Sequence, residues 1–555
     1  MVTATSMESN DSQAAAVHAS LSRNLLSSVL ALALPDHLAS DAAAQQSFVA
    51  QSAQLRAILT QHDVFSVVTD GKAFDKFHAK LFELVDQATV GRDAKAAALE
   101  LLAVVAEQCP MEQLEALQPK LMERVLKMVK YVKDAPRVVA AACAVARQLV
   151  RHIDLYAPES RRALFETLTK LLPAVLAVIG ESSTATASSD DDKAVVVQGF
   201  RLFTELLLVS PSSVRSSVAK LESAAVQVLN VAPLLQDDAV VLAAAECLAS
   251  LANASDKLHQ TWKQIVDRAI EMAHLQIDCV AGKRTVSTAA PSGMKTWLAD
   301  ADDSAADVHV YHRAATVVQR LAMVTRVLEK CLESRTISER EVQLVLSDVI
   351  ALTRRIVTIR ANEVGKQSAV SEDGFRLPTS VVYGVLPEAH ALGLRVLTAA
   401  VRRAGICALR HASKITKTLS LAVDHVHSDT HAVLYDAVAV CVKALGASTL
   451  EKVGQPLLEQ LVRQCKQDLS DDARVTKKSD EAAQPSQASG KGSKGKKRKR
   501  QAGDLSQLST NGGADGAGSS VFLSARNQLV LVKNVDAALA AIATIVAVYG
   551  GPAVD

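Results

Sequence analysis

The sequence predicts an all-α protein made of many stacked helices. Three observations support this prediction: the composition, the spacing of apolar residues, and a repeat that recurs along the chain. Of the 555 residues, 49% are hydrophobic but only 3% are aromatic, and the chain contains 23 Gly and 14 Pro. Helices accept Ala and Leu at the lowest cost, whereas strand-rich folds favour aromatic and β-branched residues and need frequent Gly and Pro turns. The length exceeds that of a single globular core, which indicates several domains or one elongated array.

Apolar residues recur at helical spacing almost without pause from residue 14 onward. Pro110, Pro136, Pro158 and Pro211 each stand where one helix should end and the next begin, because proline is tolerated in the first helical turn but not in the interior. The helices predicted from this pattern are 14–34, 44–60, 73–89, 92–108, 112–132, 135–152, 158–179, 193–209, 212–230, 237–253, 256–281, 308–332, 337–362, 387–404, 406–424, 429–446, 448–468 and 524–548.

Five of these helices resemble one another, with small residues on one side and larger aliphatic residues on the other. Aligned on Leu102 and Val145, the first two lie 43 residues apart, and the last two, aligned on Leu397 and Cys441, lie 44 apart. Two helices per period of about 40–47 residues are typical of HEAT and armadillo arrays, in which helix pairs bury their apolar faces by stacking. We therefore expect a HEAT/armadillo-like α-solenoid of stacked helix pairs. A non-repeating bundle of Ala-rich helices is the alternative. The five segments are 94–108, 137–152, 239–253, 390–405 and 431–446.

Composition divides the chain into five parts. Residues 1–282 and 308–468 are the expected N-terminal and C-terminal helical-repeat regions, and the polar residues 283–307 form a loop between them. Residues 469–520 are rich in Gly, Ser and Lys and nearly free of apolar side chains, so they cannot bury enough surface to offset chain entropy. We expect a disordered basic linker there. Residues 521–555 hold a C-terminal helix that is too apolar for free solution, so it should dock on the repeats or bind a partner.

The basic character of the chain is local, since the formal net charge is only +2. A cationic cluster inside the predicted linker is typical of a nuclear localisation signal, which implies a nuclear import receptor as partner. Non-specific RNA contact is a further interpretation. No aromatic residue interleaves the cluster for base stacking, so such contact would involve phosphates and ignore sequence. A solvated charge run is the alternative. The cluster consists of Lys494, Lys496, Lys497, Arg498, Lys499 and Arg500.

Residues 181–192 form a second polar stretch that is expected to project as a loop. Within it, Ser188 and Ser189 precede an acidic triplet, which is the pattern that acidophilic kinases select. We predict phosphorylation at these two serines, with an unmodified solvated loop as the alternative.

Catalytic and metal-binding patterns are missing from the sequence. The eight cysteines stand singly without Cys-x-x-Cys spacing, which indicates buried thiols in a reducing compartment. His427 and His431 are four residues apart, but a helix start between them favours a polar loop over a metal pair. The sequence Leu168-Thr-Lys-Leu171-Leu172 fits a receptor-binding pattern but should be buried in the core. We therefore expect no enzyme, no cofactor and no metal.

No membrane association is expected either. The N-terminal residues lack the basic region and cleavage site of a signal peptide. The longest apolar stretch without charge, residues 537–549, is shorter than the roughly 18 residues that span a bilayer. The sequence therefore predicts a soluble protein.

Residues 239–282 combine a helix ending in small residues and leucine, a short link, Trp262 and a long helix. This segment resembles the middle of the Rix-type pre-rRNA-processing proteins, called in animals the proline-, glutamate- and leucine-rich protein family. Residues 90–180 and 386–423 are similar to the same helical scaffold, so the resemblance extends over about 90–465. It implies a non-catalytic nuclear scaffold, located in nucleolus and nucleoplasm, that acts in large ribosomal subunit (pre-60S) assembly and pre-rRNA processing.

The resemblance also implies partners: a WD-repeat propeller subunit, another helical-repeat subunit, and an AAA-type ATPase that remodels the particle. The animal proteins carry a long Pro- and Glu-rich tail and many Leu-x-x-Leu-Leu motifs. Here the tail is short and basic and a single match was found, so no receptor-coactivator role is implied.

Three alternatives share features with this interpretation. An importin-like nuclear transport adaptor would have the same architecture but would bind the transport GTPase. Another helical-repeat scaffold of chromatin or transcription would also be nuclear. An enzyme whose site leaves no local pattern is the third alternative.

Overall fold

The computed structural model describes residues 4–68, 71–131, 135–184, 189–235, 238–281, 310–360, 378–446 and 517–549, with short pieces at 458–459, 462–463 and 466. All regular secondary structure in these residues is helical, which confirms the all-α prediction. The chain divides into two compact units. The first comprises Met1–Glu341 and Ala369–Leu377, and the second comprises Val342–Ser368 and Pro378–Asp555.

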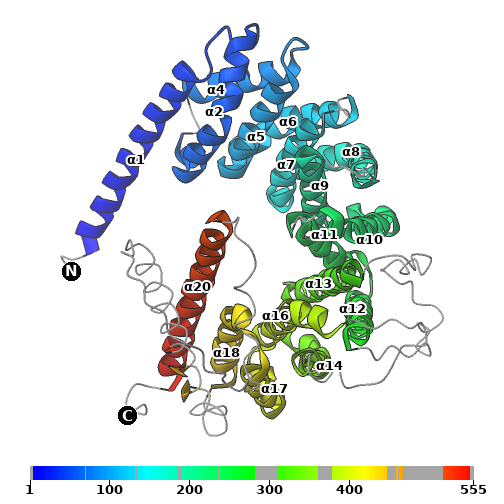
Figure 1. Ribbon diagram of the computed structural model, residues 1–555. Helices are drawn as coiled ribbons and strands as arrows, with labels where there is room; N and C mark the ends of the chain where they lie inside the picture. The colour runs from blue at the N-terminus through cyan, green and yellow to red at the C-terminus, as the bar shows by residue number, and fades with distance from the viewer. Residues whose placement is uncertain are drawn as a thin grey trace, which may run out of the picture. The chain divides into compact units, whose positions relative to one another are not determined.

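The first unit contains thirteen α-helices within the described residues (Figure 1). Short 3₁₀ turns η1 (Ile153–Leu155), η2 (Pro211–Ser213), η3 (Arg215–Ser217) and η4 (Leu251–Ala254) lie between some of them. The α-helices are α1 (Ala4–Leu32), α2 (Ala42–Gln61), α3 (Val64–Val67), α4 (Lys72–Asp86), α5 (Arg92–Gln108), α6 (Met111–Tyr131), α7 (Pro136–Arg151), α8 (Pro158–Thr184), α9 (Asp190–Val209), α10 (Val218–Leu235), α11 (Asp238–Ser250), α12 (Leu258–Ala281) and α13 (Val310–Glu333).

These helices form two rows. In the inner row α2, α5, α7, α9, α11 and α13 pack successively against one another. In the outer row α4, α6, α8, α10 and α12 each pack against the inner helix that follows them in sequence (Figure 1). The repeating unit is therefore an antiparallel helix pair stacked on its neighbours, as the α-solenoid prediction requires.

Small residues allow the inner helices to stack closely. Ala97 in α5, Ala141 in α7 and Ala244 in α11 are all buried, and each lies among further buried alanines of the same helix. Helices approach one another most closely where side chains are small, and α5, α7 and α11 each have an inner helix on both sides. The five positions that align the sequence repeats are buried as well: Leu102, Val145, Leu248, Leu397 and Cys441.

Polar contacts between neighbouring helix pairs show the same period. The backbone N–H of Gly91 donates to Oε1 of the buried Gln45, 46 residues away, at 2.9 Å. The N–H of Ala157 donates to Glu115, 42 residues away, at 3.0 Å. Equivalent positions of adjacent repeats thus meet across the stack, where side chains satisfy backbone groups at helix ends that would otherwise lack partners.

The second unit is smaller. The helix α16 packs on α18, and α18 packs on both α17 and α20. Most residues of α14 also belong to this unit, and α14 contacts α16 through the hydrogen bond from Oγ1 of Thr353 to the carbonyl of Gly393, 3.1 Å long. Its described helices are α14 (Glu339–Val357), α16 (Thr379–Ala404), η5 (Gly405–His411), α17 (Ala412–His425), η6 (Ser428–Thr430), α18 (His431–Leu445) and α20 (Ala517–Tyr549).

The C-terminal helix α20 docks on α18, one of the two outcomes that its apolar sequence predicts. Ala538, Ala541 and Ile545 are buried on one face at helical spacing. The buried Asn534 lies on the same face, and its Oδ1 accepts a hydrogen bond of 3.0 Å from the N–H of Ala432 in the first turn of α18. Because Thr430, the N-cap residue of α18, makes no side-chain capping bond, Asn534 caps this helix from a distance.

Most predicted helices agree with the structure, and the exceptions have physical reasons. The prediction that a helix begins at residue 387 was wrong: α16 begins at Thr379 and passes through Pro387. The buried Val381 and Val382 hold the first turns against the core, which outweighs the hydrogen bond that proline removes. The predicted loop 181–192 is shorter than expected, since α8 ends at Thr184 and α9 begins at Asp190.

The five-part division of the chain stays a prediction. The loop 283–307 and most of the linker 469–520 lie outside the described residues, and α20 begins at Ala517, inside the predicted linker. The predicted helix 448–468 is described only at a few positions.

Among the described residues, one segment is long and apolar enough to cross a membrane: Pro158–Ser182 of α8. The helix packs against α6, α9 and α10, and its Leu164, Leu168 and Leu171 are buried there. Stacking in the outer row therefore accounts for its apolar character.

A histidine and a glycine define the contact between α14 and α16. His390 of α16 is buried, and burial lowers the pKa of its imidazole to about 4, so the ring is neutral at neutral pH. A Cβ atom at Gly393 would lie 3.1 Å from Cδ1 and Cγ2 of Ile356 and 3.2 Å from its Cβ. Since the Cβ of Ile356 is fixed to its backbone, a side chain at position 393 requires the two helices to separate.

We expect Gly393→Val to lower the free energy of unfolding by about 1–3 kcal/mol, the usual cost of overpacking a core. The matched control is Gly384→Val in the same helix, where a Cβ would meet nothing within 4 Å. That change should alter stability by less than about 1 kcal/mol, since valine is the better helix former. Urea unfolding followed by circular dichroism measures both. Equal midpoints for the two variants would contradict the close contact.

Candidate interaction surface

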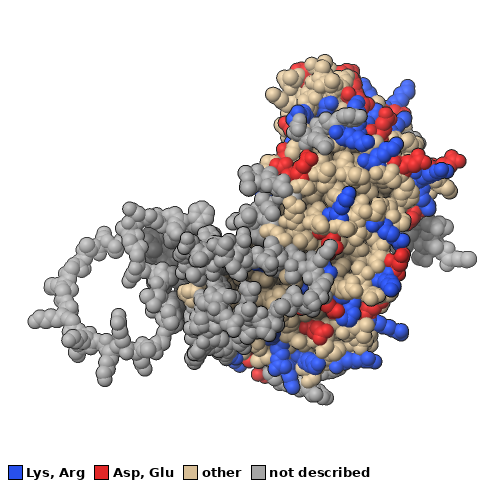
Figure 2. Space-filling model, turned by 90° about the vertical axis from the view of Figure 1, so that its right-hand side faces the viewer, with Lys and Arg blue, Asp and Glu red and all other residues tan. Residues whose placement is uncertain are grey.

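The surface of the protein carries charges of both signs. Figure 2 shows Lys and Arg side chains interspersed with Asp and Glu on the face turned to the viewer, with uncharged surface between them. On the inner row the charged residues are arranged in pairs that join neighbouring helices. We call the solvent-facing residues of α2, α5, α7, α9, α11 and α13 the inner surface.

The first group of pairs joins α2, α5 and α7. Glu100 of α5 accepts a hydrogen bond from Arg56 of α2 at 3.3 Å, and its other carboxylate oxygen lies 3.5 Å from Arg137 of α7. Arg137 also lies 3.9 Å from Asp93 of α5. Acidic side chains of α5 are therefore neutralised from both neighbouring helices.

The second group joins α5, α7 and α9. Arg151 at the end of α7 lies 4.0 Å from Glu107 of α5 and 3.8 Å from Glu205 of α9. Nearby, burial and the neighbouring Arg201 lower the pKa of the Arg147 guanidinium, while Glu205 acts in the opposite direction. The guanidinium groups of α7 and the carboxylates of α5 and α9 alternate across the row.

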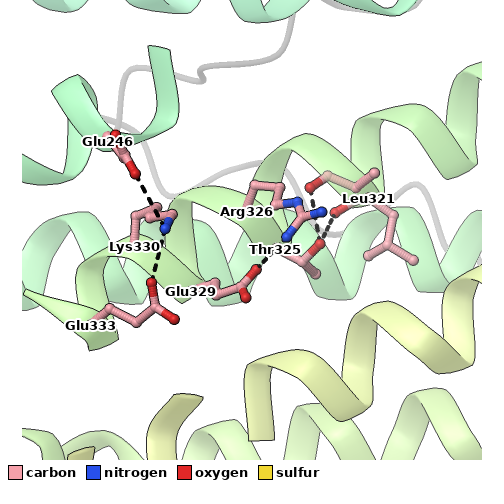
Figure 3. A network of polar contacts seen from close by, with 8 residues as sticks. Glu246, Leu321, Thr325, Arg326, Glu329, Lys330 and Glu333 are labelled. Atoms are coloured by element: carbon pink, nitrogen blue, oxygen red, sulfur yellow. Dashed lines mark hydrogen bonds and ion pairs between the residues drawn. The ribbon is translucent and has the colours of Figure 1, made fainter. Parts of the chain in front are cut away.

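The third group joins α11 and α13 (Figure 3). Nζ of Lys330 lies 3.2 Å from Glu246 of α11 and 2.9 Å from Glu333 of its own helix. One turn earlier, Arg326 pairs with Glu329 at 2.9 Å. Burial by itself would lower the pKa of Lys330, but the hydrogen bonds and charges of Glu333 and Glu246 raise it above its ordinary value. The ammonium group is thus held in its charged form between two helices.

The arrangement limits what the inner surface can bind. Arg56, Arg137, Arg151 and Lys330 each pair with a carboxylate of a neighbouring helix, so these four cations provide no continuous positive field for a nucleic-acid backbone. Helical-repeat solenoids bind their partners along extended surfaces of this kind. The inner surface is therefore a candidate site for protein partners.

These ion pairs were not predicted, although the sequence contains a signal for them. Asp93 and Arg137 are 44 residues apart, as are Glu107 and Arg151 and also Arg56 and Glu100. This spacing equals the helical repeat, so opposite charges one period apart indicate contacts between adjacent repeats. The period and the charges are each visible in the sequence, but the ion pairs can be predicted only by comparing charges that lie one period apart.

A shallow hollow lies at the start of α8 in the outer row. It has a volume of about 390 Å³ and opens widely to solvent. Its lining consists of Pro158, Arg161, Arg162, Phe165, Glu166 and Thr169. Enzyme sites are usually enclosed and contain converging polar groups, whereas here Arg162 pairs with Glu166 along the same helix at 3.5 Å. The hollow does not resemble a catalytic cleft.

Most of the predicted site residues lie outside the described part of the chain. This applies to the whole basic cluster from Lys494 to Arg500 and to Ser188. Ser189 is described and exposed, and it is the N-cap of α9. Its Oγ accepts a hydrogen bond of 3.2 Å from the N–H of Asp192, whose carboxylate accepts one of 3.1 Å from the N–H of Ser189. These reciprocal bonds form a capping box, so the acidic residues also begin a helix. Phosphorylation of Ser188 and Ser189 stays a prediction.

The described cysteines are buried or half-buried, as their single placement in apolar helices predicts; Cys465 lies outside the described residues. Burial raises the pKa of Cys143, Cys331 and Cys441 to about 12, so these thiols stay protonated at neutral pH. Buried, protonated thiols are inert, which excludes these residues as nucleophiles.

The histidines near residue 430 have separate environments. His427 lies in the loop, 3.7 Å from Asp429, and the buried ring of His431 stacks obliquely near Tyr435, 5.6 Å away. His425 contacts Arg360. In the described part of the chain no group of three or more His, Cys, Asp or Glu side chains is placed to hold a metal ion.

The receptor-binding pattern in α8 is inaccessible. Leu168, Leu171 and Leu172 are all buried in the outer row, as predicted. A groove of another protein therefore cannot take up these leucines while the repeat is folded.

Fold and surface together define the class of protein: an α-solenoid with a surface suited to protein partners. Residues 22–233, less than half of the chain, match the RIX1 family, described as rRNA processing/ribosome biogenesis. The match begins before the predicted resemblance over 90–465 and ends earlier, so it excludes the segment around Trp262. No curated protein sequence matches the chain.

Solved structures with similar folds are helical-repeat proteins. A chain of the Rix1 subcomplex of a Rix1–Rea1 pre-60S particle matches over 76% of this chain and 77% of its own length, with a TM-score of 0.51 and 11% identity. Kap121p bound to Nup53p matches 80% of this chain with 10% identity and a TM-score of 0.24, and Kap121p bound to Pho4p matches 96% with 12% identity and a TM-score of 0.25. These matches cover 52% and 53% of the Kap121p chains, so this chain spans about half their length.

We expect Lys330→Met to lower the free energy of unfolding by about 1 kcal/mol in low salt and by less in 1 M salt, because Glu246 and Glu333 lose their shared cation. The control is Lys263→Met, whose partner Asp267 lies 2.6 Å away on the same helix. Pairs of that kind contribute only about 0.3–0.5 kcal/mol. Urea unfolding at both salt concentrations measures the difference. If the two variants behave alike, Lys330 does not link α11 to α13.

Proposed function

We propose that this protein is a non-catalytic scaffold of pre-60S ribosome assembly and pre-rRNA processing. The observation that carries the proposal is the RIX1 match over residues 22–233, which lies on helices α1 to α10 of the solenoid. The fold likeness to a chain of the Rix1 subcomplex over 76% of this chain supports it. Repeat solenoids hold partners along extended surfaces, and the inner surface offers such a face.

A non-enzymatic role is supported by the chemistry of the described residues. The buried thiols of Cys143, Cys331 and Cys441 are protonated, and the buried imidazole of His390 is neutral. On the inner surface, Arg137, Arg151 and Lys330 each pair with a carboxylate of a neighbouring helix. Catalytic groups usually combine a perturbed pKa with a cleft that a substrate can enter. Here the perturbed groups lie within the helix packing.

The proposed partners are protein subunits of a pre-ribosomal complex. The similar solved chain belongs to a particle that contains Rea1, so we propose an AAA-type remodelling ATPase as one partner. A WD-repeat propeller subunit and a second helical-repeat subunit complete the proposed set. The inner surface suits such folded partners better than short peptides, since its ion pairs span several helices.

A nuclear and nucleolar location accompanies this function, with entry through an import receptor that binds the basic cluster. The transport-adaptor alternative is less well supported, because the TM-scores to Kap121p of 0.24 and 0.25 are too low to carry an argument.

We expect the protein to co-sediment with large-subunit precursors in lysate, because a scaffold remains bound to the particle it assembles. Its depletion should cause precursor rRNA that still contains the internal spacer upstream of the large rRNA to accumulate. Gradient sedimentation and blotting with a spacer probe measure the two effects. A protein found only in light fractions, bound to the GTP form of the transport GTPase, would establish the adaptor alternative.

We expect a fluorescent fusion to be nuclear with nucleolar enrichment, and alanines at Lys496–Arg500 to shift it toward the cytoplasm. The import receptor recognises this run of five cations, so its loss should slow import. The matched control replaces Lys477 and Lys478 in the same segment by alanine and should leave the distribution unchanged. Microscopy of living cells measures both. An unchanged five-alanine variant would show that the cluster is not the localisation signal.

A further inference from the structure

The second unit carries positive charge that acidic neighbours do not balance. Residues 342–360 and 378–446 contain ten Lys and Arg but only five Asp and Glu. In the described residues the side chains of Arg354, Arg410 and Lys417 are exposed and have no ion-pair partner. The inner surface of the first unit, by contrast, joins its charges in pairs.

Part of this charge forms a row on α17. Arg410 precedes Lys414 by four residues and Lys417 follows by three, so the three cations share one exposed side of η5 and α17. The opposite side of α17 is buried through Ile415 and Leu419. Burial and the neighbouring Lys414 and Arg410 lower the pKa of His411, which is consistent with a positive field there.

Exposed aliphatic side chains lie beside this row. Ile406 is 72% exposed and Leu409 39% exposed, and both belong to η5. Across the row, Lys414 donates a hydrogen bond of 3.3 Å to Oγ of Ser347 on α14. One turn before Ser347 lies Leu344, which is 72% exposed.

The two aliphatic residues of η5 share one side of this 3₁₀ helix. It runs for seven residues, Gly405–His411, whereas 3₁₀ runs longer than about four residues are uncommon. Gly405, at the C-cap of α16, has a φ of +51°, so the chain leaves α16 through a conformation that favours glycine. Ile406 and Leu409 are three residues apart, so they lie on the same side of this 3₁₀ helix, and both are exposed.

We propose that these side chains form a docking site for an acidic protein segment that folds as an amphipathic helix. The site, the basic–aliphatic patch, consists of Leu344, Ile406, Leu409, Arg410, Lys414 and Lys417. Three cations at helical spacing are complemented by carboxylates at helical spacing on a partner helix. The aliphatic side chains supply the apolar centre that protein interfaces have.

Nucleic acid fits the patch less well. The segment from Arg402 to His425 and the helix α14 contain no Phe, Tyr or Trp on which bases could stack. Exposed leucine and isoleucine gain nothing from phosphate contacts. An acidic helix with apolar residues uses both kinds of side chain in the patch. This inference deepens the proposed scaffold function, on which it rests, by giving the chemistry of one partner.

The test uses the full-length protein and a fluorescent 21-residue synthetic peptide with Glu and Leu on adjoining faces of one helix. A peptide of the same composition in scrambled order and a 20-nucleotide oligouridine are the comparison probes. We expect saturable binding of the amphipathic peptide in fluorescence anisotropy, weaker binding of the scrambled peptide, and weakening as salt rises. Lys414→Glu with Lys417→Glu should weaken binding at least tenfold, and Ile406→Ser should weaken it severalfold.

The matched control is Lys443→Glu, which reverses an exposed cation on α18 and should leave binding unchanged. Because the substituted side chains are exposed, circular dichroism should show an unchanged fold in every variant. Failure of the peptide to bind, or equal binding by all variants, overturns the proposal. Oligouridine binding that the same substitutions abolish also overturns it and assigns the patch to nucleic acid. None of these outcomes affects co-sedimentation with ribosomal precursors, so failure here is distinct from failure of the proposed function.

Discussion

The first unit depends on the stacking of one helix pair on the next. A pair of amphipathic helices exposes an apolar face that it cannot bury alone, so each inner helix must contact the inner helices before and after it. The small residues meet this requirement: the buried Ala97, Ala141 and Ala244 allow close approach of the helix backbones. Within a helix pair, Gly199 of α9 allows a close approach to α8, since a Cβ at this position would lie 2.7 Å from Cδ1 of Ile179. The surface charges are then brought together at intervals of one repeat.

Much of the fold could be predicted from the sequence because it follows from local signals. Helical spacing of apolar residues and prolines at helix starts placed α5, α7 and α8 to within one residue at their N-termini. The start of α16 could not be predicted in this way, because tertiary packing of Val381 and Val382 overrides the local effect of Pro387. The remote cap of α18 by Asn534 is likewise invisible locally, since the two partners are 102 residues apart.

The candidate surfaces were harder to predict than the helices. Ile406 and Leu409 belong to a helix predicted over 406–424, and the apolar pattern alone does not tell which of its aliphatic residues face solvent. In the structure both residues lie in the 3₁₀ helix η5 and are exposed. Which residues form the inner surface depends on the side of each helix that the neighbouring helices cover. The sequence of a single repeat does not determine that side. Stacking geometry, rather than any single motif, creates both surfaces.

The two units differ in how many of their charged side chains form ion pairs, and this difference affects which partners each unit can bind. In the first unit, ion pairs between adjacent helices use charges to hold the repeats in register, so fewer remain for partners. In the second unit, Arg410 and Lys417 have no acidic neighbour in the described residues and remain available. Exposed pairs contribute little stability, so the register of the first unit still rests mainly on apolar packing.

The position of α20 brings two distant parts of the chain together. The helix α18 ends at Leu445 and α20 begins at Ala517, and the two helices pack directly on one another in the second unit. The described helices on either side of residues 447–516 therefore belong to the same unit. A closed loop costs only slightly more entropy as it lengthens, so docking of α20 is compatible with a long connection. The contact through Asn534 and Ala432 thus joins residues that are 102 positions apart in the sequence and holds the C-terminal helix in the second unit.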